Sequence, residues 1–137
     1  METILDNPHN TIYFDQENQL HYQVTKPETG NLYEEEFKQM LITWKESIFK
    51  LEPKLLLIDN RELQYPITPT VQDWIAQNIT LPIAEHGAVK KCCFVMPNEF
   101  IAQLSQAQLN QEIETVNNTV LFSYFADLEE AKAWLLS

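Results

Sequence analysis

Apolar and polar positions alternate near the start of the chain, and the alternation predicts two strands. Residues 11–15 (TIYFD) and 20–25 (LHYQVT) are rich in β-branched and aromatic side chains, and the polar residues 16–19 (QENQ) separate them. Two such runs joined by a short polar loop are typical of a β-hairpin. We interpret the residues before Thr11 as a short polar lead.

The period changes to that of an amphipathic helix at residues 33–50. Apolar side chains recur there at spacings of three and four, which places them on one helix face. They are Tyr33, Phe37, Met40, Leu41, Trp44 and Ile48. Pro53 ends the helix, and residues 54–60 (KLLLIDN) form an apolar run typical of a strand that is buried on both faces.

A second helix is predicted from the pair Thr68 and Pro69, a hydroxyl N-cap followed by proline at the first helical position. We expect it to continue to about Ile79. Pro82 then breaks the helical pattern, so a separate short turn should lead to Gly87.

Strands and helices continue to alternate to the end of the chain. Strands are expected at residues 90–96 (KKCCFVM) and 120–125 (VLFSYF), with a helix capped by Asn98 between them and a last helix from Asp127. The order predicts a single α/β domain over residues 1–137, with a mostly parallel five-stranded sheet, an antiparallel N-terminal strand and about four helices.

Charge and glycine content exclude some functions. The chain has 20 Asp and Glu against 9 Lys and Arg, a net charge of −11, so nucleic acid is not an expected partner. Its two glycines, Gly30 and Gly87, lie far apart, whereas a phosphate-binding loop needs several within a short span.

Cysteine and histidine positions bear on compartment and metal binding. Adjacent residues on a strand point to opposite faces, so Cys92 and Cys93 should not form a disulfide. The histidines share no ligand spacing, and we expect neither a metal nor a cofactor. The chain starts without a basic or apolar leader and has no apolar run of roughly 18 residues, which predicts a soluble cytoplasmic protein without a transmembrane segment.

Three segments carry a family resemblance: LLLID at 55–59 with the extended loop after it, KKCCFVMPNEF at 90–100, and YFADLEEAKAWL at 124–135. Together with the order of elements, they resemble SpoIIAA-like proteins, small bacterial relatives of STAS domains. The resemblance implies a cytoplasmic domain built on a βα superhelix. Members of this family serve in signalling or bind partners, and some open helices over an apolar pocket for lipid-like ligands.

One departure from the related anti-sigma-factor antagonists limits what the resemblance implies. Those proteins present a phosphorylatable serine in an Asp-Ser-Ser-Gly passage after this strand. The present chain has Asp59, Asn60, Arg61 and Glu62 there, without serine or glycine. The phosphorylation cycle is therefore not expected in this protein.

Polar candidate residues fall at the carboxyl end of the predicted sheet, where open α/β folds bind ligands. Asp59, Asn60 and Arg61 lie there, and a guanidinium can clamp a carboxylate or phosphate; alternatively, Arg61 pairs with an acid of the protein. Thr68 and Thr70 flank Pro69 and either accept a phosphate at a helix start or only cap the helix.

Two apolar residues, Ile42 and Phe49, lie seven positions apart on the first long helix, off its core face. They are candidates for a partner or homodimer surface. The alternative is that this helix is buried over a wide angle.

The apolar segment 79–84 (ITLPIA) is broken by proline and suited to movement. We expect it to bound an apolar pocket; the alternative is that it only packs over the sheet. The candidate pocket residues are Trp74, Ile75, Ile79, Leu81, Ile83, Phe100, Ile101 and Leu104.

These observations predict a non-enzymatic regulatory domain that binds a small apolar or lipid-like molecule, or a protein partner in bacterial signalling. The alternative is a homodimeric interaction module without a small-molecule ligand. An enzyme using Asp59 and Arg61 ranks third, because only the topology supports it.

Overall fold

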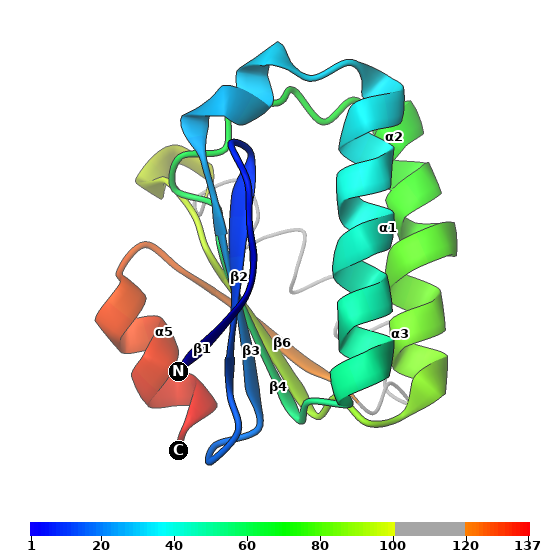
Figure 1. Ribbon diagram of the computed structural model, residues 1–137. Helices are drawn as coiled ribbons and strands as arrows, with labels where there is room; N and C mark the ends of the chain where they lie inside the picture. Colours follow the sequence, from blue (N-terminus) through cyan, green and yellow to red (C-terminus); the bar gives the residue numbers. More distant parts are fainter. Residues whose placement is uncertain (101–119) are drawn as a thin grey trace.

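A six-stranded mixed sheet forms the centre of the protein, and its strands lie side by side in chain order (Figure 1). The computed structural model describes residues 1–100 and 120–137. Pairs β1–β2 and β2–β3 are antiparallel, and β3 to β6 are parallel. The strands are β1 (Glu2–Asp6), β2 (Asn10–Asp15), β3 (Leu20–Thr25), β4 (Leu55–Asp59), β5 (Lys91–Val95) and β6 (Leu121–Phe125).

The predicted hairpin is confirmed as β2 and β3, but the expected number of five strands is wrong. Residues 2–6, which we interpreted as a polar lead, form the edge strand β1. Four of its five side chains are exposed, so the strand carries no apolar period from which it could be recognised. Main-chain pairing with β2 holds it in the sheet.

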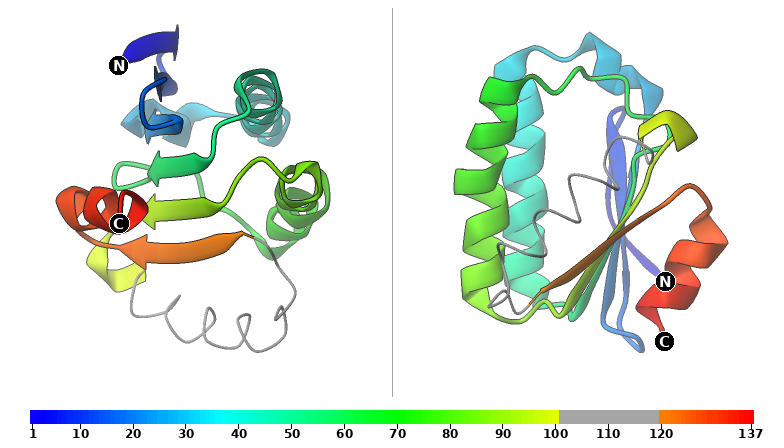
Figure 2. Two further views of the ribbon diagram at one scale, coloured as in Figure 1. Left: turned by 90° about the horizontal axis from the view of Figure 1, so that it is seen from below. Right: turned by 180° about the vertical axis from the view of Figure 1, so that it is seen from behind.

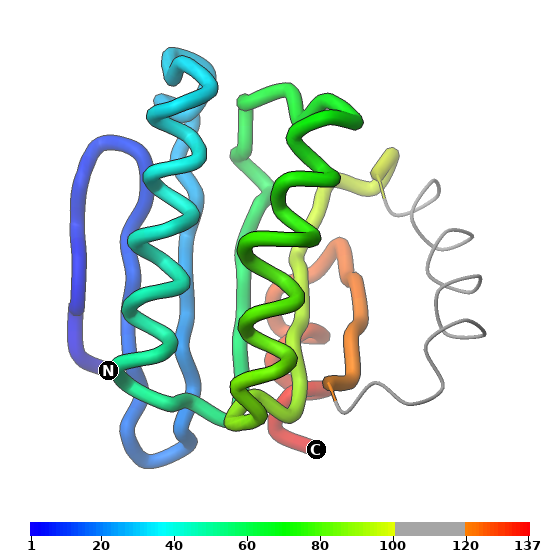
Figure 3. The backbone as a smooth tube through the Cα atoms, turned by 90° about the vertical axis from the view of Figure 1, so that its right-hand side faces the viewer, coloured from blue at the N-terminus to red at the C-terminus, as the bar shows by residue number. Residues whose placement is uncertain are grey.

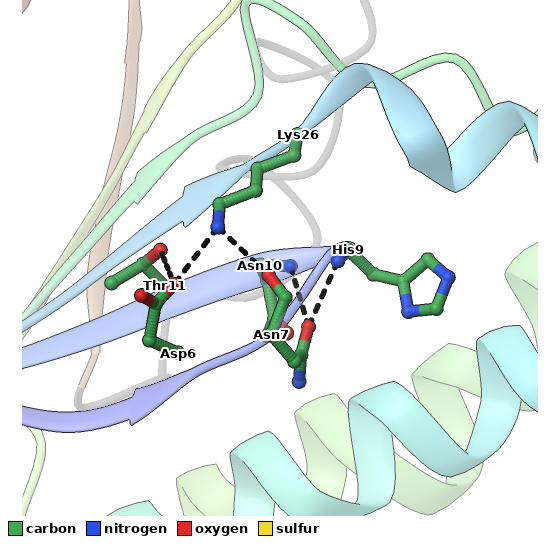
Figure 4. Close-up of polar contacts among 6 residues, drawn as sticks. All are labelled: Asp6, Asn7, His9, Asn10, Thr11 and Lys26. Atoms are coloured by element: carbon green, nitrogen blue, oxygen red, sulfur yellow. Dashed lines mark hydrogen bonds and ion pairs between the residues drawn. The ribbon is translucent and has the colours of Figure 1, made fainter.

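Side-chain contacts fix the turn between β1 and β2 (Figure 4). Oδ1 of Asn7 accepts hydrogen bonds from the backbone N–H groups of His9 and Asn10, both at 2.9 Å. Nζ of Lys26 lies 2.8 Å from Oδ1 of Asp6 and 2.8 Å from the carbonyl oxygen of Asn7. The hydrogen bond from Lys26 lowers the pKa of Asp6. These bonds place Asn10 at the start of β2, where its side chain is buried.

Helices cover both faces of the sheet (Figures 1 and 2). Helix α5 lies on one face, and the long helix α1 lies on the other beside a second helical segment that runs in the same direction (Figure 3). Each face has its own apolar core cluster. The bounds are η1 (Pro27–Asn31), α1 (Glu34–Leu51), α2 (Pro69–Ile75), η2 (Ala76–Thr80), α3 (Leu81–His86) and α5 (Leu128–Leu135). The predicted helix after Asn98 lies mainly outside the described residues.

The segment from Pro69 to His86 departs from the expected break. Helix α2, the π-helical η2 and α3 follow one another without an intervening loop. Pro82 has no N–H group to donate to the carbonyl four residues earlier, which belongs to Asn78. Nζ of Lys45 on α1 donates to that oxygen instead, at 3.0 Å. The wider π turn and the lysine together let the helix pass the proline, and we name residues 69–86 the wall helix.

The face of β3 beneath α1 carries a row of buried polar side chains, His21, Gln23 and Thr25. Oγ of Ser47 donates to the carbonyl oxygen of Trp44 at 2.6 Å. It therefore accepts its second bond, at 2.8 Å, from Nε2 of His21, which identifies the neutral tautomer protonated at Nε2. Burial lowers the pKa of His21 from 6.5 to about 4.

This buried histidine should make stability depend on pH. The folded protein excludes a proton that the unfolded chain takes up below pH 6.5, so the free energy of unfolding falls as the pH drops from 6.5 to 4. We expect this group to remove about 2–3 kcal/mol between pH 7 and pH 4.5. Urea unfolding of the wild type and of His21→Gln, which keeps a donor for Ser47, measures the difference. Identical pH dependence in the two proteins would contradict the prediction.

Candidate functional site

A cavity of about 140 Å³ lies between the sheet and the two helices that cover it. Its walls are almost entirely apolar and come from α1, the wall helix and the inner face of β4 to β6. The apolar residues lining it include Phe37, Met40, Leu41 and Trp44 of α1, Ile75, Ile79, Ile83 and Ala84 of the wall helix, and Leu56, Ile58, Cys92, Phe94 and Phe122 of the sheet.

Apart from Thr80 on the wall helix, the hydroxyl and amide residues of the lining lie at or near the carboxyl ends of the parallel strands. Gln23 and Thr25 lie on β3, and Asn60 follows β4 directly. Oγ1 of Thr25 donates to Oδ1 of Asn60 at 2.7 Å, which joins the two strand ends. Among the described lining residues there is no acidic, basic or histidine side chain. The site is thus an uncharged apolar cavity with a polar end.

The wall helix supplies three of the pocket residues predicted from the sequence. Ile75, Ile79 and Ile83 line the cavity, because a spacing of four keeps them on one helix face. Leu81 does not: it lies two positions from both Ile79 and Ile83, on the opposite face, and is 47% exposed.

The other predicted pocket residues lie elsewhere or are not described. Trp74 packs against the core but is outside the lining, with Nζ of Lys38 at 5.2 Å from its ring centre. Phe100 is exposed. Ile101 and Leu104 lie outside the described residues.

Sequence reasoning missed two parts of the lining. The α1 residues were recognised as a core face, but an apolar period does not show where packing leaves space. Gln23 and Thr25 alternate with the apolar Tyr22 and Val24, and this alternation reads as a strand with one solvent-facing side.

The carboxylate and guanidinium candidates at the end of β4 satisfy one another. Arg61 donates from Nε to Oδ1 of Asp59 at 3.0 Å and from a terminal nitrogen to Oδ2 at 2.8 Å. The Asp59 side chain is 6% exposed and that of Arg61 45% exposed. The hydrogen bond from Arg61 to Asp59 raises the pKa of the guanidinium. The guanidinium of Arg61 is therefore already bonded to a carboxylate of the protein itself, that of Asp59.

The remaining polar candidates have structural contacts. Oγ1 of Thr68 accepts the backbone N–H of Val71 at 3.4 Å, as an N-cap. Thr70 is exposed in the first turn of α2. Neither lines the cavity.

The two interface candidates on α1 pack against the core, although their spacing places them off the core face of the helix. Ile42 and Phe49 are half-buried and lie against the core cluster beneath α1. The ring of Phe49 stacks on that of His86, with centroids 5.0 Å apart. Neither residue forms a fully exposed apolar ridge.

Cys92 and Cys93 are free thiols that belong to core clusters on opposite faces of the sheet. Burial raises both pKa values, that of Cys93 to about 12. Within residues 1–100 and 120–137, no group of three His, Cys, Asp or Glu side chains is placed to hold a metal ion. In the same residues, no helix combines the length and apolar character needed to cross a membrane.

No protein-family model, curated protein or solved structure matches this chain.

The Asp59–Arg61 pair should contribute to stability. Arg61→Leu leaves a buried carboxylate without its two guanidinium bonds, and we expect the free energy of unfolding to fall by about 1–2 kcal/mol. Glu129→Leu is the control, because Glu129 is exposed and its pair with Lys132, at 3.9 Å, is worth roughly 0–0.5 kcal/mol. Urea unfolding measures both variants. An equal fall in the free energy of unfolding would show that the Asp59–Arg61 pair contributes no more to stability than an exposed ion pair.

Proposed function

We propose that this protein is a non-enzymatic regulatory domain that binds a small apolar molecule in the cavity beneath α1 and the wall helix. The observation that carries the proposal is the cavity itself, about 140 Å³ of space with apolar walls and one polar end. Apolar atoms that face empty space lose dispersion contacts, and a bound apolar molecule restores them.

The volume indicates the size of the molecule. An apolar cavity of roughly 150 Å³ in another protein binds benzene. A compound of about six to eight non-hydrogen atoms is therefore the expected occupant, and a long acyl chain would require the helices to move apart.

A regulatory role is favoured over catalysis by the chemistry of the lining. Among the described lining residues, the thiol of Cys92 is the one ionisable side chain, and burial raises its pKa far above neutrality. A reactive thiolate needs a lowered pKa. Arg61, the cation of the enzymatic alternative, is paired with Asp59.

The wall helix is the element through which we propose that binding acts. It contributes Ile75, Ile79 and Ile83 to the cavity, and its π turn is bonded to α1 through Lys45 and Asn78. A ligand that binds one arrangement of this helix better than another shifts the population between them. The resemblance to SpoIIAA-like proteins supports this mechanism and is part of the proposal, as are a cytoplasmic location and a signalling partner.

Ligand binding can be tested with benzene and cyclohexane. We expect each to stabilise the folded protein, by about 2.7 kcal/mol when its concentration is a hundredfold above Kd. Ala84→Phe should fill the cavity and abolish this response. Leu81→Phe adds the same ring on the exposed face of the same helix and should leave the response intact. Calorimetric melting with and without each compound gives the result, and unchanged melting of the wild type would refute the proposal.

A further inference from the structure

The polar end of the cavity contains two amide side chains whose nitrogens donate no hydrogen bond to the described residues. Gln23 is only 3% exposed, and its Oε1 accepts from Nδ2 of Asn10 at 2.7 Å. The oxygen of the Gln23 carboxamide is therefore bonded, whereas its Nε2 group donates to no atom of the described residues. Gln23 lines the cavity, and the mostly apolar walls offer this nearly buried donor few acceptors.

Asn60, which is partly exposed, is a second amide at the end of the neighbouring strand. Its Oδ1 accepts from Oγ1 of Thr25, and its Nδ2 likewise donates to no atom of the described residues. Residues 23 and 58 are paired in the parallel ladder between β3 and β4, so Gln23 and Asn60 come from adjacent strand ends. Two primary amides with unused nitrogen donors thus belong to the same end of the cavity lining.

Donors of this kind select an acceptor. A carbonyl oxygen has two lone pairs and can receive an N–H group from each amide. A buried donor that lacks an acceptor is costly, so a ligand that supplies one is favoured over a hydrocarbon of equal size.

The charges around the site oppose a carboxylate ligand. Among the described lining residues no Lys, Arg or His is present to compensate a negative charge. Arg61, the cation next to Asn60 in the sequence, is already paired with Asp59, and the whole chain has a net charge of −11. A carboxylate would lose its hydration without gaining a counter-ion.

We infer that the ligand is a neutral carbonyl compound, such as a small ketone, ester, lactone or amide, whose oxygen accepts from Gln23 Nε2 and Asn60 Nδ2 while its hydrocarbon part fills the apolar cavity. This inference rests on the proposed function, since it specifies the chemistry of the molecule bound there.

Cyclohexane, cyclohexanone and cyclohexanecarboxylate separate the alternatives, because they share one ring and differ in the polar group. Dissociation constants at pH 7 are measured by NMR titration for the wild type, Gln23→Met and Asn60→Asp. Asn60→Asp keeps an acceptor for Thr25 and removes the nitrogen donor. Gln23→Met leaves Asn10 without its acceptor. If Gln23→Met does not fold for that reason, Asn60→Asp still tests the inference. Gln39→Met on the exposed face of α1 is the control substitution.

We expect each site variant to weaken cyclohexanone about tenfold and cyclohexane less than about twofold, with Gln39→Met without effect. Failure of both cyclohexane and cyclohexanone to bind the wild type would refute the proposed function. If cyclohexane binds but the affinity for cyclohexanone is unchanged in both variants, the carbonyl inference alone is wrong. Tighter binding of cyclohexanecarboxylate than of cyclohexanone would also overturn it.

Discussion

The rest of the structure depends on the burial of a polar row on β3 beneath a layer of helices. His21, Gln23 and Thr25 lose their contact with water there, and each must be compensated by a hydrogen bond. His21 is bonded to Ser47 of α1, Gln23 to Asn10 of β2, and Thr25 to Asn60 after β4. The compensation is incomplete, because each carboxamide offers more groups than its neighbours use. Within the described residues, the amide nitrogens of Gln23 and Asn60 donate no hydrogen bond, and both side chains line the cavity, so the chemistry of the candidate site follows from how the fold buries its own strand.

The two sides of the sheet differ in how their polar groups are satisfied. Asp59 and Asn60 are neighbours at the end of β4, yet the carboxylate of Asp59 is bonded twice by Arg61, while the amide of Asn60 belongs to the cavity on the face beneath α1. The ionic groups near the strand ends are thus paired with each other, and the cavity has an uncharged lining among the described residues. A cavity of this kind is better suited to a neutral ligand than to a phosphate or carboxylate.

Much of the fold could be predicted from the sequence because most elements carry an apolar period. The hairpin, α1 and the strands β4 to β6 follow from such patterns, whereas β1 was missed because its pairing depends on main-chain bonds to β2. The wall helix passes Pro82 because Lys45, which is distant in sequence, takes the place of the missing N–H group. For the cavity, the spacing of four between Ile75, Ile79 and Ile83 was informative. Gln23 was not recognisable, because a polar residue that alternates with apolar ones reads as solvent-facing unless a second layer is known to cover it.

The wall helix links the cavity to contacts outside it. Its inner face touches the space that a ligand would fill, and it is joined to α1 by the bond from Lys45 to Asn78 and by the stacking of Phe49 on His86. The wall helix cannot move relative to α1 without changing these two contacts. A proline and a π turn lie at this point, where the regular i→i−4 hydrogen-bond pattern is already interrupted, so less regular bonding opposes a displacement here than in an unbroken helix. Under the proposed function, a molecule that fills the cavity would therefore act first on this segment, whose opposite face bears the exposed Leu81.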